Sequence, residues 1–166
     1  MKIKEVQDAL EQISEEKITQ LIDLVETHDK IIIIGNGGSN AIASHIAQDY
    51  TKQLKKRAVA FSDPSRLTCY INDYGMDNAY TQFVKEFTTK KSLVILISSS
   101  GNSQNILNCA AYCAETEIDF ITLTGFDSNN KLRDNFGEKS LVDFWVDSHC
   151  YGVVECTHQI ILHVPS

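Results

Sequence analysis

Two stretches of the sequence share one pattern: IIIIGNGGSN at residues 31–40 and LVILISSSGNSQNIL at residues 93–107. Each is a short run of aliphatic residues that leads into a loop of glycine, serine and asparagine. A nearly continuous apolar run of this length is typical of a strand buried on both faces of a parallel sheet. The two stretches therefore predict two inner strands, each followed by a polar loop and a helix.

The rest of the chain repeats this alternation of short apolar runs and longer amphipathic segments. It predicts a three-layer α/β sandwich, in which a five-stranded parallel sheet is flanked by helices. The length of 166 residues suits a single domain spanning 1–166, with an N-terminal helical segment at 1–29 that packs on the domain or in an oligomer interface. The expected strands are 30–34, 58–61, 93–97, 120–123 and 141–146, and the expected helices are 15–27, 39–54, 78–88, 103–115 and 153–162.

Composition excludes several classes of protein. The net charge is −7, whereas a nucleic-acid-binding protein needs a basic surface. No apolar run approaches the roughly 20 residues that a membrane-spanning helix needs. The five cysteines are odd in number and form no CxxC motif, which favours a reducing compartment over a disulfide framework. We therefore expect a cytoplasmic protein that binds neither nucleic acid nor membranes.

The two polar loops are candidate sites for an anionic ligand. Glycine at 35, 37, 38 and 101 lets the backbone turn sharply and approach a ligand closely. The N-terminus of the helix after each loop offers unpaired N–H groups and a partial positive charge. One such loop is as easily a tight turn with a serine cap. Two loops in equivalent positions favour a ligand site at the carboxyl edge of the sheet.

Histidines and carboxylates on two helical segments form a third candidate site. His45 and Asp49 are four residues apart, so they share one helix face. Glu155 and His163 are eight apart on the last segment and also share roughly one face. Two imidazoles and two carboxylates suit a divalent metal ion with an open coordination position. The alternative for each residue taken alone is a partly buried or solvated helix position.

These stretches, together with INDYGMDNAYTQFV at 71–84 and ITLTGFDSNNKL at 121–132, resemble the SIS domain family. The strand–SxSGxS–helix segment is typical of that family, and GNGGS combined with it indicates the phosphoheptose isomerase branch. The resemblance implies a flavodoxin-like or Rossmann-like SIS fold and an aldose–ketose isomerase. Members of the branch interconvert sedoheptulose 7-phosphate and a heptose 7-phosphate through an enediol, and many bind zinc. They are homotetramers with active sites at subunit contacts, and the reaction feeds heptose synthesis for surface polysaccharide such as lipopolysaccharide or capsule.

The resemblance also implies roles for individual residues of this chain. Asp49 and His163 are the expected catalytic acid–base pair. Zn²⁺ is the expected cofactor, and a phosphorylated sugar is the expected substrate. The expected metal ligands are His45, Asp49, Glu155 and His163. The expected substrate contacts are Asn36, Gly37, Gly38, Ser39, Asn72, Asp73, Ser98, Ser99, Ser100 and Ser103, with Ser98, Ser100 and Ser103 as the phosphate clamp.

The chain departs from the family pattern near the predicted metal site. The family usually has glutamate at the position of Asp49 and glutamine at that of Glu155, and it has charged residues where this chain has Ile42, Gln53 and Gly152. Two alternatives therefore stay open. One is a non-catalytic SIS protein that acts as a phosphosugar sensor or as a scaffold, like members that bind the replication initiator. The other is an isomerase of a smaller sugar phosphate such as arabinose 5-phosphate.

Overall fold

A computed structural model describes residues 2–166, which form a five-stranded parallel sheet flanked by helices. The strand order is β2-β1-β3-β4-β5. Each neighbouring pair is parallel, so all carboxyl ends meet at one edge. The predicted fold class is confirmed. The strands are β1 (Lys30–Gly35), β2 (Arg57–Ala60), β3 (Ser92–Ser98), β4 (Asp119–Thr124) and β5 (Val142–Trp145).

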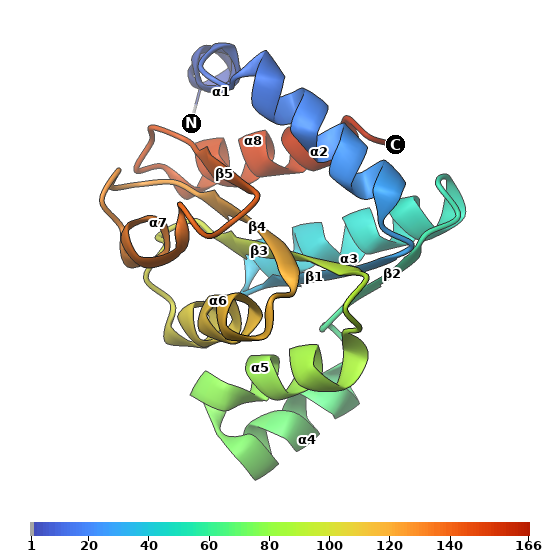
Figure 1. Cartoon of the computed structure of the whole chain (residues 1–166). Coiled ribbons are helices and arrows are strands. Elements are labelled where there is room, and N and C mark those ends of the chain that lie inside the picture. The colour runs from blue at the N-terminus through green and yellow to red at the C-terminus, as the bar shows by residue number, and fades with distance from the viewer. Residues whose placement is uncertain (1) are drawn as a thin grey trace.

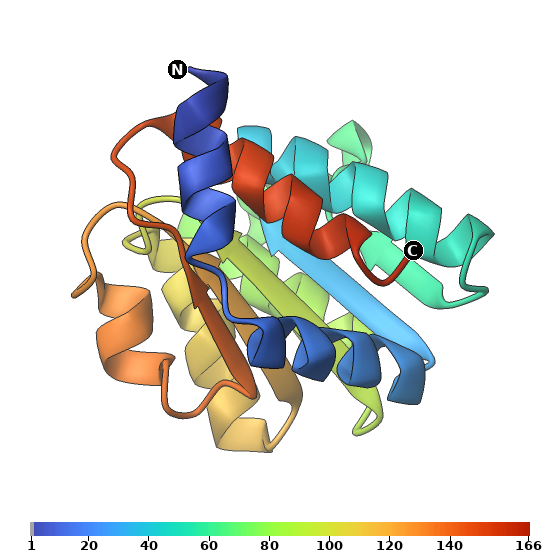
Figure 2. The same cartoon turned by 90° about the horizontal axis from the view of Figure 1, so that it is seen from above.

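Helices cover both faces of the sheet (Figure 1). One face packs against α2 (Glu15–Thr27), α3 (Gly38–Lys52) and α8 (Tyr151–His163). The other packs against α4 (Pro64–Tyr74), α5 (Met76–Phe87), α6 (Gln104–Thr116) and α7 (Lys131–Phe136). Figure 2 shows α1 (Ile3–Glu11) lying across the start of α8, where its Ala9 packs with Val153 and Val154. None of the helices within residues 2–166 is long and apolar enough to cross a membrane.

Strand β1 shows why its sequence is apolar without alternation. Ile31 and Ile33 pack into the core under α2, α3 and α8, whereas Ile32 and Ile34 pack into the core over α5 and α6. All four side chains are fully buried. A strand with helices on both faces needs apolar residues at every position, which is the pattern that the sequence carries.

Two helices have no counterpart among the predicted elements. Helix α4 has no buried residue, so its apolar pattern is weak. Its start is nonetheless encoded locally, because Asp63 accepts a hydrogen bond from the Arg66 N–H at 2.9 Å and Pro64 occupies the first helical turn. Helix α7 spans only 6 residues, too few for a periodic signal. Helices α1 and α2 both lie within the segment 1–29.

The strand order creates a crevice between β1 and β3. From β1 the chain continues through α3 to β2 on one side, and β3 then pairs with the other side of β1. The helices that follow β1 and β3 therefore lie on opposite faces, α3 on one and α6 on the other. Such a switch point is where open α/β sheets bind ligands.

Candidate active site

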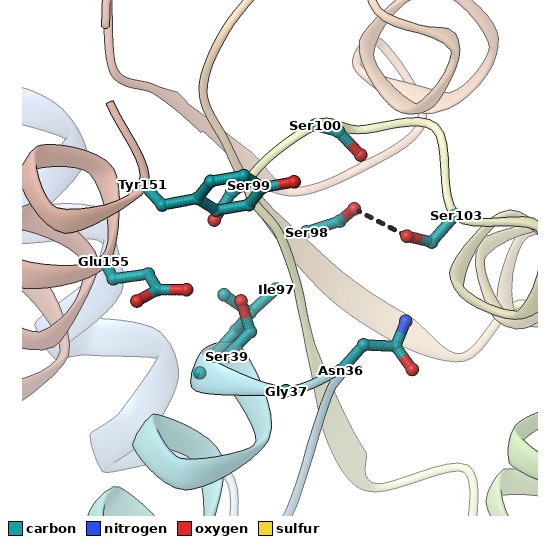
Figure 3. Close-up of a pocket in the computed structure, with 11 residues that line it drawn as sticks. Asn36, Gly37, Ser39, Ile97, Ser98, Ser99, Ser100, Ser103, Tyr151 and Glu155 are labelled. Atoms are coloured by element: carbon teal, nitrogen blue, oxygen red, sulfur yellow. Dashed lines mark hydrogen bonds between the residues drawn. The ribbon is translucent and has the colours of Figure 1, made fainter. Parts of the chain in front are cut away.

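A cavity of about 250 Å³ opens at this crevice, between the loop after β1 and the loop after β3 (Figure 3). The start of α8 forms its third wall. None of the described residues that line it is a lysine or an arginine, so a bound anion would be held by hydroxyl and backbone N–H groups. The lining residues are Asn36, Gly37, Gly38, Ser39, Ile97, Ser98, Ser99, Ser100, Ser103, Tyr151 and Glu155.

The loop after β1 brings the N-terminus of α3 to the cavity. Gly37 caps this helix with φ 53°, a left-handed conformation that favours glycine. A side chain at Gly38 would overlap the carboxylate of Glu155, which lies directly against it. Ser39 follows in the first turn and is almost fully buried. The glycines thus allow the helix terminus, with its unpaired N–H groups, to line the cavity.

The loop after β3 contributes serine hydroxyls. Ser98 donates a long hydrogen bond of 3.5 Å to the hydroxyl oxygen of Ser103. Ser103 is the N-cap residue of α6, yet its side chain caps no N–H group within residues 2–166. Ser100 accepts a 3.3 Å hydrogen bond from the Asn102 N–H. The Ser98 and Ser103 hydroxyls are therefore weakly engaged and available to a ligand.

Ser99 is placed differently from its neighbours. Its side-chain oxygen is buried and has no hydrogen-bond partner within residues 2–166. Its carbonyl oxygen accepts a 2.9 Å hydrogen bond from the Gly125 N–H, which ties the loop to the end of β4. Ser99 lines the cavity, and its backbone carbonyl holds the loop against the end of β4.

An amide pair joins the loop after β1 to the first turn of α6, the helix that follows the serine loop. The Asn36 Nδ2 group donates to Asn105 Oδ1 at 2.9 Å, and the Asn105 Nδ2 group donates to Asn36 Oδ1 at 3.0 Å. Asn105 is buried on α6, and its Oδ1 also accepts the Ile106 N–H. Asn36 lines the cavity as expected for a sugar contact, but it also fixes the spacing of the loops. No pattern in the sequence singles out Asn105.

Three of the four predicted metal ligands meet on the adjoining surface of α3 and α8. The Nε2 atoms of His45 and His163 each lie 3.3 Å from Asp49 Oδ2. The two rings are 5.2 Å apart between centroids. The three ligand atoms all lie within 4.8 Å of one another, close enough to share one ion. The His45 side chain is 54% exposed, so the cluster opens to solvent.

The hydrogen bonding of His163 fits a cation at this place. Its Nδ1 atom lies 2.8 Å from the Gln159 carbonyl oxygen, which can only accept, so Nδ1 carries the proton. In the neutral ring Nε2 then presents a lone pair to the Asp49 carboxylate. A proton or a metal ion between them removes the repulsion. An Nδ1–H···O=C bond is the usual way to orient a metal-binding imidazole.

Glu155, the fourth predicted ligand, lies apart from the cluster of His45, Asp49 and His163. It precedes His163 by eight residues, about 12 Å along the helix axis, and its carboxylate lines the serine cavity against Gly38. Among residues 2–166 the grouping of possible metal ligands contains His45, Asp49 and His163 without it. Within one chain, therefore, the four predicted ligands do not meet at a single point.

Asn72 and Asp73 also lie outside the cavity of their own chain. Both are exposed on α4, and the Asn72 Nδ2 group donates to Asp73 Oδ1 at 2.9 Å. Neither contributes to the cavity lining. Tyr151 does line it, although no motif marks this residue. Its spacing of four from Glu155 puts both on one face of α8, and this spacing is the signal that could have found it.

A second hollow connects the two parts of the site. It has a volume of about 620 Å³ and lies between α3 and α8. It shares Gly38 and Glu155 with the serine cavity and extends to His45 at its other end. The serine cavity and the histidine cluster are therefore two ends of one surface on the same helix pair.

Fold and site together define an α/β protein with a polar cavity at its switch point and a histidine–carboxylate cluster beside it. The sequence model described as "SIS domain" matches residues 2–125. The chain belongs to the SIS domain family.

Named relatives and solved structures show which members of the family the chain is similar to. The chain is 30% identical over 167 residues to a phosphoheptose isomerase of Fusobacterium nucleatum, with 97% of this chain and 84% of the relative covered. A solved phosphoheptose isomerase of Neisseria gonorrhoeae superposes with a TM-score of 0.88 at 30% identity, covering 98% of this chain and 90% of that one. A phosphoheptose isomerase structure from Francisella tularensis, at 21% identity, gives 0.83 over 95% and 87% of the two chains and supports the fold.

Proposed function

We propose that this chain is a phosphoheptose isomerase, which interconverts sedoheptulose 7-phosphate and a heptose 7-phosphate through an enediol. The observation that carries the proposal is the His45–Asp49–His163 cluster on the same helix pair as the serine cavity. Acid–base groups and an anion cavity are the two parts that isomerisation of a sugar phosphate needs. The similarity to named phosphoheptose isomerases supports this activity.

The serine loop binds the phosphate in this proposal. Ser98, Ser100 and Ser103 supply hydroxyls, and the start of α6 supplies backbone N–H groups. Asn36 on the loop after β1 and Ser39 in the first turn of α3 lie across the cavity from this loop (Figure 3). In the proposal these two residues contact the sugar. Binding of the phosphate, remote from the reacting carbons, provides the energy that holds the sugar in its reactive position.

Asp49 and His163 transfer the protons. An aldose–ketose isomerisation needs a base that moves a proton between adjacent carbons and an acid that serves the carbonyl oxygen. The two side chains already face each other at 3.3 Å, and the Gln159 carbonyl fixes the orientation of the His163 ring. They share the two roles at C1 and C2 of the sugar.

The cluster also suits the expected zinc ion. Two imidazole nitrogens and one carboxylate oxygen within 4.8 Å form a donor set typical of Zn²⁺ with an open position. Zinc, when bound, would supply positive charge next to the enediolate oxygens. His45, Asp49 and His163 are the residues that would hold it.

We also propose a homotetramer as the functional state. The exposed cluster and the position of Asn72 and Asp73 outside their own cavity fit an active site completed by a neighbouring copy. Light scattering of the purified chain tests this, since a species of 18.6 kDa at micromolar concentration contradicts it. The proposed role is heptose synthesis for surface polysaccharide, and the cytoplasmic location stays a prediction.

The decisive experiment offers the purified chain a panel of ketose phosphates, with and without zinc, in D₂O. We expect an aldose phosphate from sedoheptulose 7-phosphate, with solvent deuterium at C2 because the transferred proton exchanges in the enediol. Turnover of ribulose 5-phosphate to arabinose 5-phosphate instead would reassign the substrate. Tight phosphosugar binding without turnover of any member would identify the non-catalytic sensor or scaffold.

A further inference from the structure

The α8 wall of the serine cavity carries one aromatic ring and one carboxylate. Tyr151 and Glu155 lie across the cavity from Ser100 and Ser103 (Figure 3). Glu155 is the one formally charged residue among the described residues that line it. The cavity thus has an end suited to an anion and an opposite wall that carries a negative charge.

The Glu155 carboxylate has free acceptor capacity at this wall. It rests against Gly38, in the space that any larger side chain there would fill. Its position near the N-terminus of α3 is favourable, because the helix dipole stabilises a negative charge at that end. No donor within residues 2–166 forms a hydrogen bond to its oxygens, so they can accept from the hydroxyls of a ligand.

Tyr151 adds a flat apolar surface beside this carboxylate. Tyr151 is 59% exposed, and its ring meets the Phe126 ring edge-to-face at 4.9 Å between centroids. Phe126 in turn stacks on His149 at 5.4 Å, so the tyrosine is supported from behind. A supported ring can pack on the C–H groups of a sugar, while the carboxylate accepts from its hydroxyls.

We infer that Glu155 is a specificity-determining residue that selects sugar monophosphates with an uncharged polyol end against ligands that carry a second anionic group. This rests on the proposed function, because it takes the serine loop as the phosphate site. A second phosphate or a carboxylate placed toward α8 meets the Glu155 charge in a partly desolvated cavity, where like charges repel more strongly than in water.

A matched ligand pair tests the inference. Sedoheptulose 7-phosphate and sedoheptulose 1,7-bisphosphate differ only in the second phosphate, and calorimetric titration gives the ratio of their dissociation constants. In Glu155→Gln this ratio should shift toward the bisphosphate by at least about tenfold, since the amide keeps the shape and removes the charge. Titrations with and without a chelator separate any attraction of the second phosphate by a cation at the histidine cluster.

Two further variants complete the design. Glu155→Asp keeps the charge and should keep the discrimination, whereas a merely steric role would be kept in Glu155→Gln, which has the same shape, and weakened in the shorter Glu155→Asp. Glu115→Gln removes the same charge from the exposed far end of α6 and should leave the ratio unchanged. A ratio that is the same in wild type and Glu155→Gln overturns the inference while the proposed function stands. Failure of the wild type to bind either ligand removes the proposed function, and the inference with it.

Discussion

The serine cavity and the histidine cluster lie on the same helix pair but are held in different ways. The cavity is built from loops that buried contacts fix, with the Asn36–Asn105 amide pair between them and the Ser99 carbonyl bonded to Gly125. The cluster stands on the outer surfaces of two regular helices, and its His45 side chain is more than half exposed.

This difference separates binding from chemistry. The serine loop of the proposed phosphate site comes from one chain, so this loop should bind a phosphate without a neighbouring copy. The cluster brings two imidazoles and one carboxylate together, and in the proposed function it works with a metal ion and a neighbouring copy. Changes in the serine cavity should therefore affect phosphosugar binding, and changes in the histidine cluster should affect turnover.

The largest expected effect is on phosphosugar binding by Ser100→Ala combined with Ser103→Ala. Each hydrogen bond to a charged acceptor contributes about 1.5–3 kcal/mol, so the double variant should lose about 3–6 kcal/mol of binding free energy. Titration with sedoheptulose 7-phosphate measures the loss. The melting temperature serves as the control for folding. Unchanged affinity in a folded double variant would remove the phosphate site from this loop.

The next largest effect distinguishes the role of the histidine cluster from that of the serine cavity. His163→Asn should lower the rate of isomerisation by about 10²–10⁴-fold, because it removes a proton-transfer group from the cluster. Phosphosugar affinity should be retained, since His163 does not line the serine cavity. His28→Asn, at a histidine that pairs with Asp119 at the start of β4 and lies away from both regions, is the matched control. Full activity of His163→Asn contradicts the proton-transfer role.

The sequence predicts the fold well because strands that are buried on both faces of the sheet have continuous apolar sequences. Strands β1 and β3 are apolar at nearly every position, and the loops after them carry the glycines that their geometry needs. Helices α4 and α7 leave little trace, since the first buries no residue and the second is short. Packing, rather than local preference, decides such elements.

The sequence predicts the arrangement of site residues only where those residues lie in one segment of the chain. His45 and Asp49 share a helix face by spacing alone, and so do Glu155 and Tyr151. Which turn of α8 lies opposite which turn of α3 depends on how the two helices pack, and this places Glu155 at the cavity and His163 at the cluster. The Asn36–Asn105 pair joins residues 69 positions apart, so no local pattern encodes it.

A second histidine on α8 sharpens the contrast between the two regions. His158 is fully buried, and its Nε2 atom lies 3.0 Å from the Thr124 carbonyl oxygen at the end of β4. Burial lowers the pKa of His158 to about 4, so the ring is neutral in the folded protein at pH 7. It therefore supports the packing of α8 on the sheet, whereas His163, five residues later, belongs to the cluster.

The smallest expected effect follows from this neutral ring. The pKa is about 6.5 in the unfolded chain and lower in the folded one, so the unfolded state binds the extra proton first as the pH falls. The contribution of His158 to stability is thus present above pH 6.5 and is lost between pH 6.5 and 4, by about 3 kcal/mol.

In His158→Gln, whose amide can still donate to Thr124, this part of the pH dependence should disappear. Denaturant unfolding from pH 7.5 to 4 measures it as the difference between wild type and variant, which cancels the carboxylates that titrate in the same range. An identical slope in His158→Gln would show that the buried ring does not stay neutral.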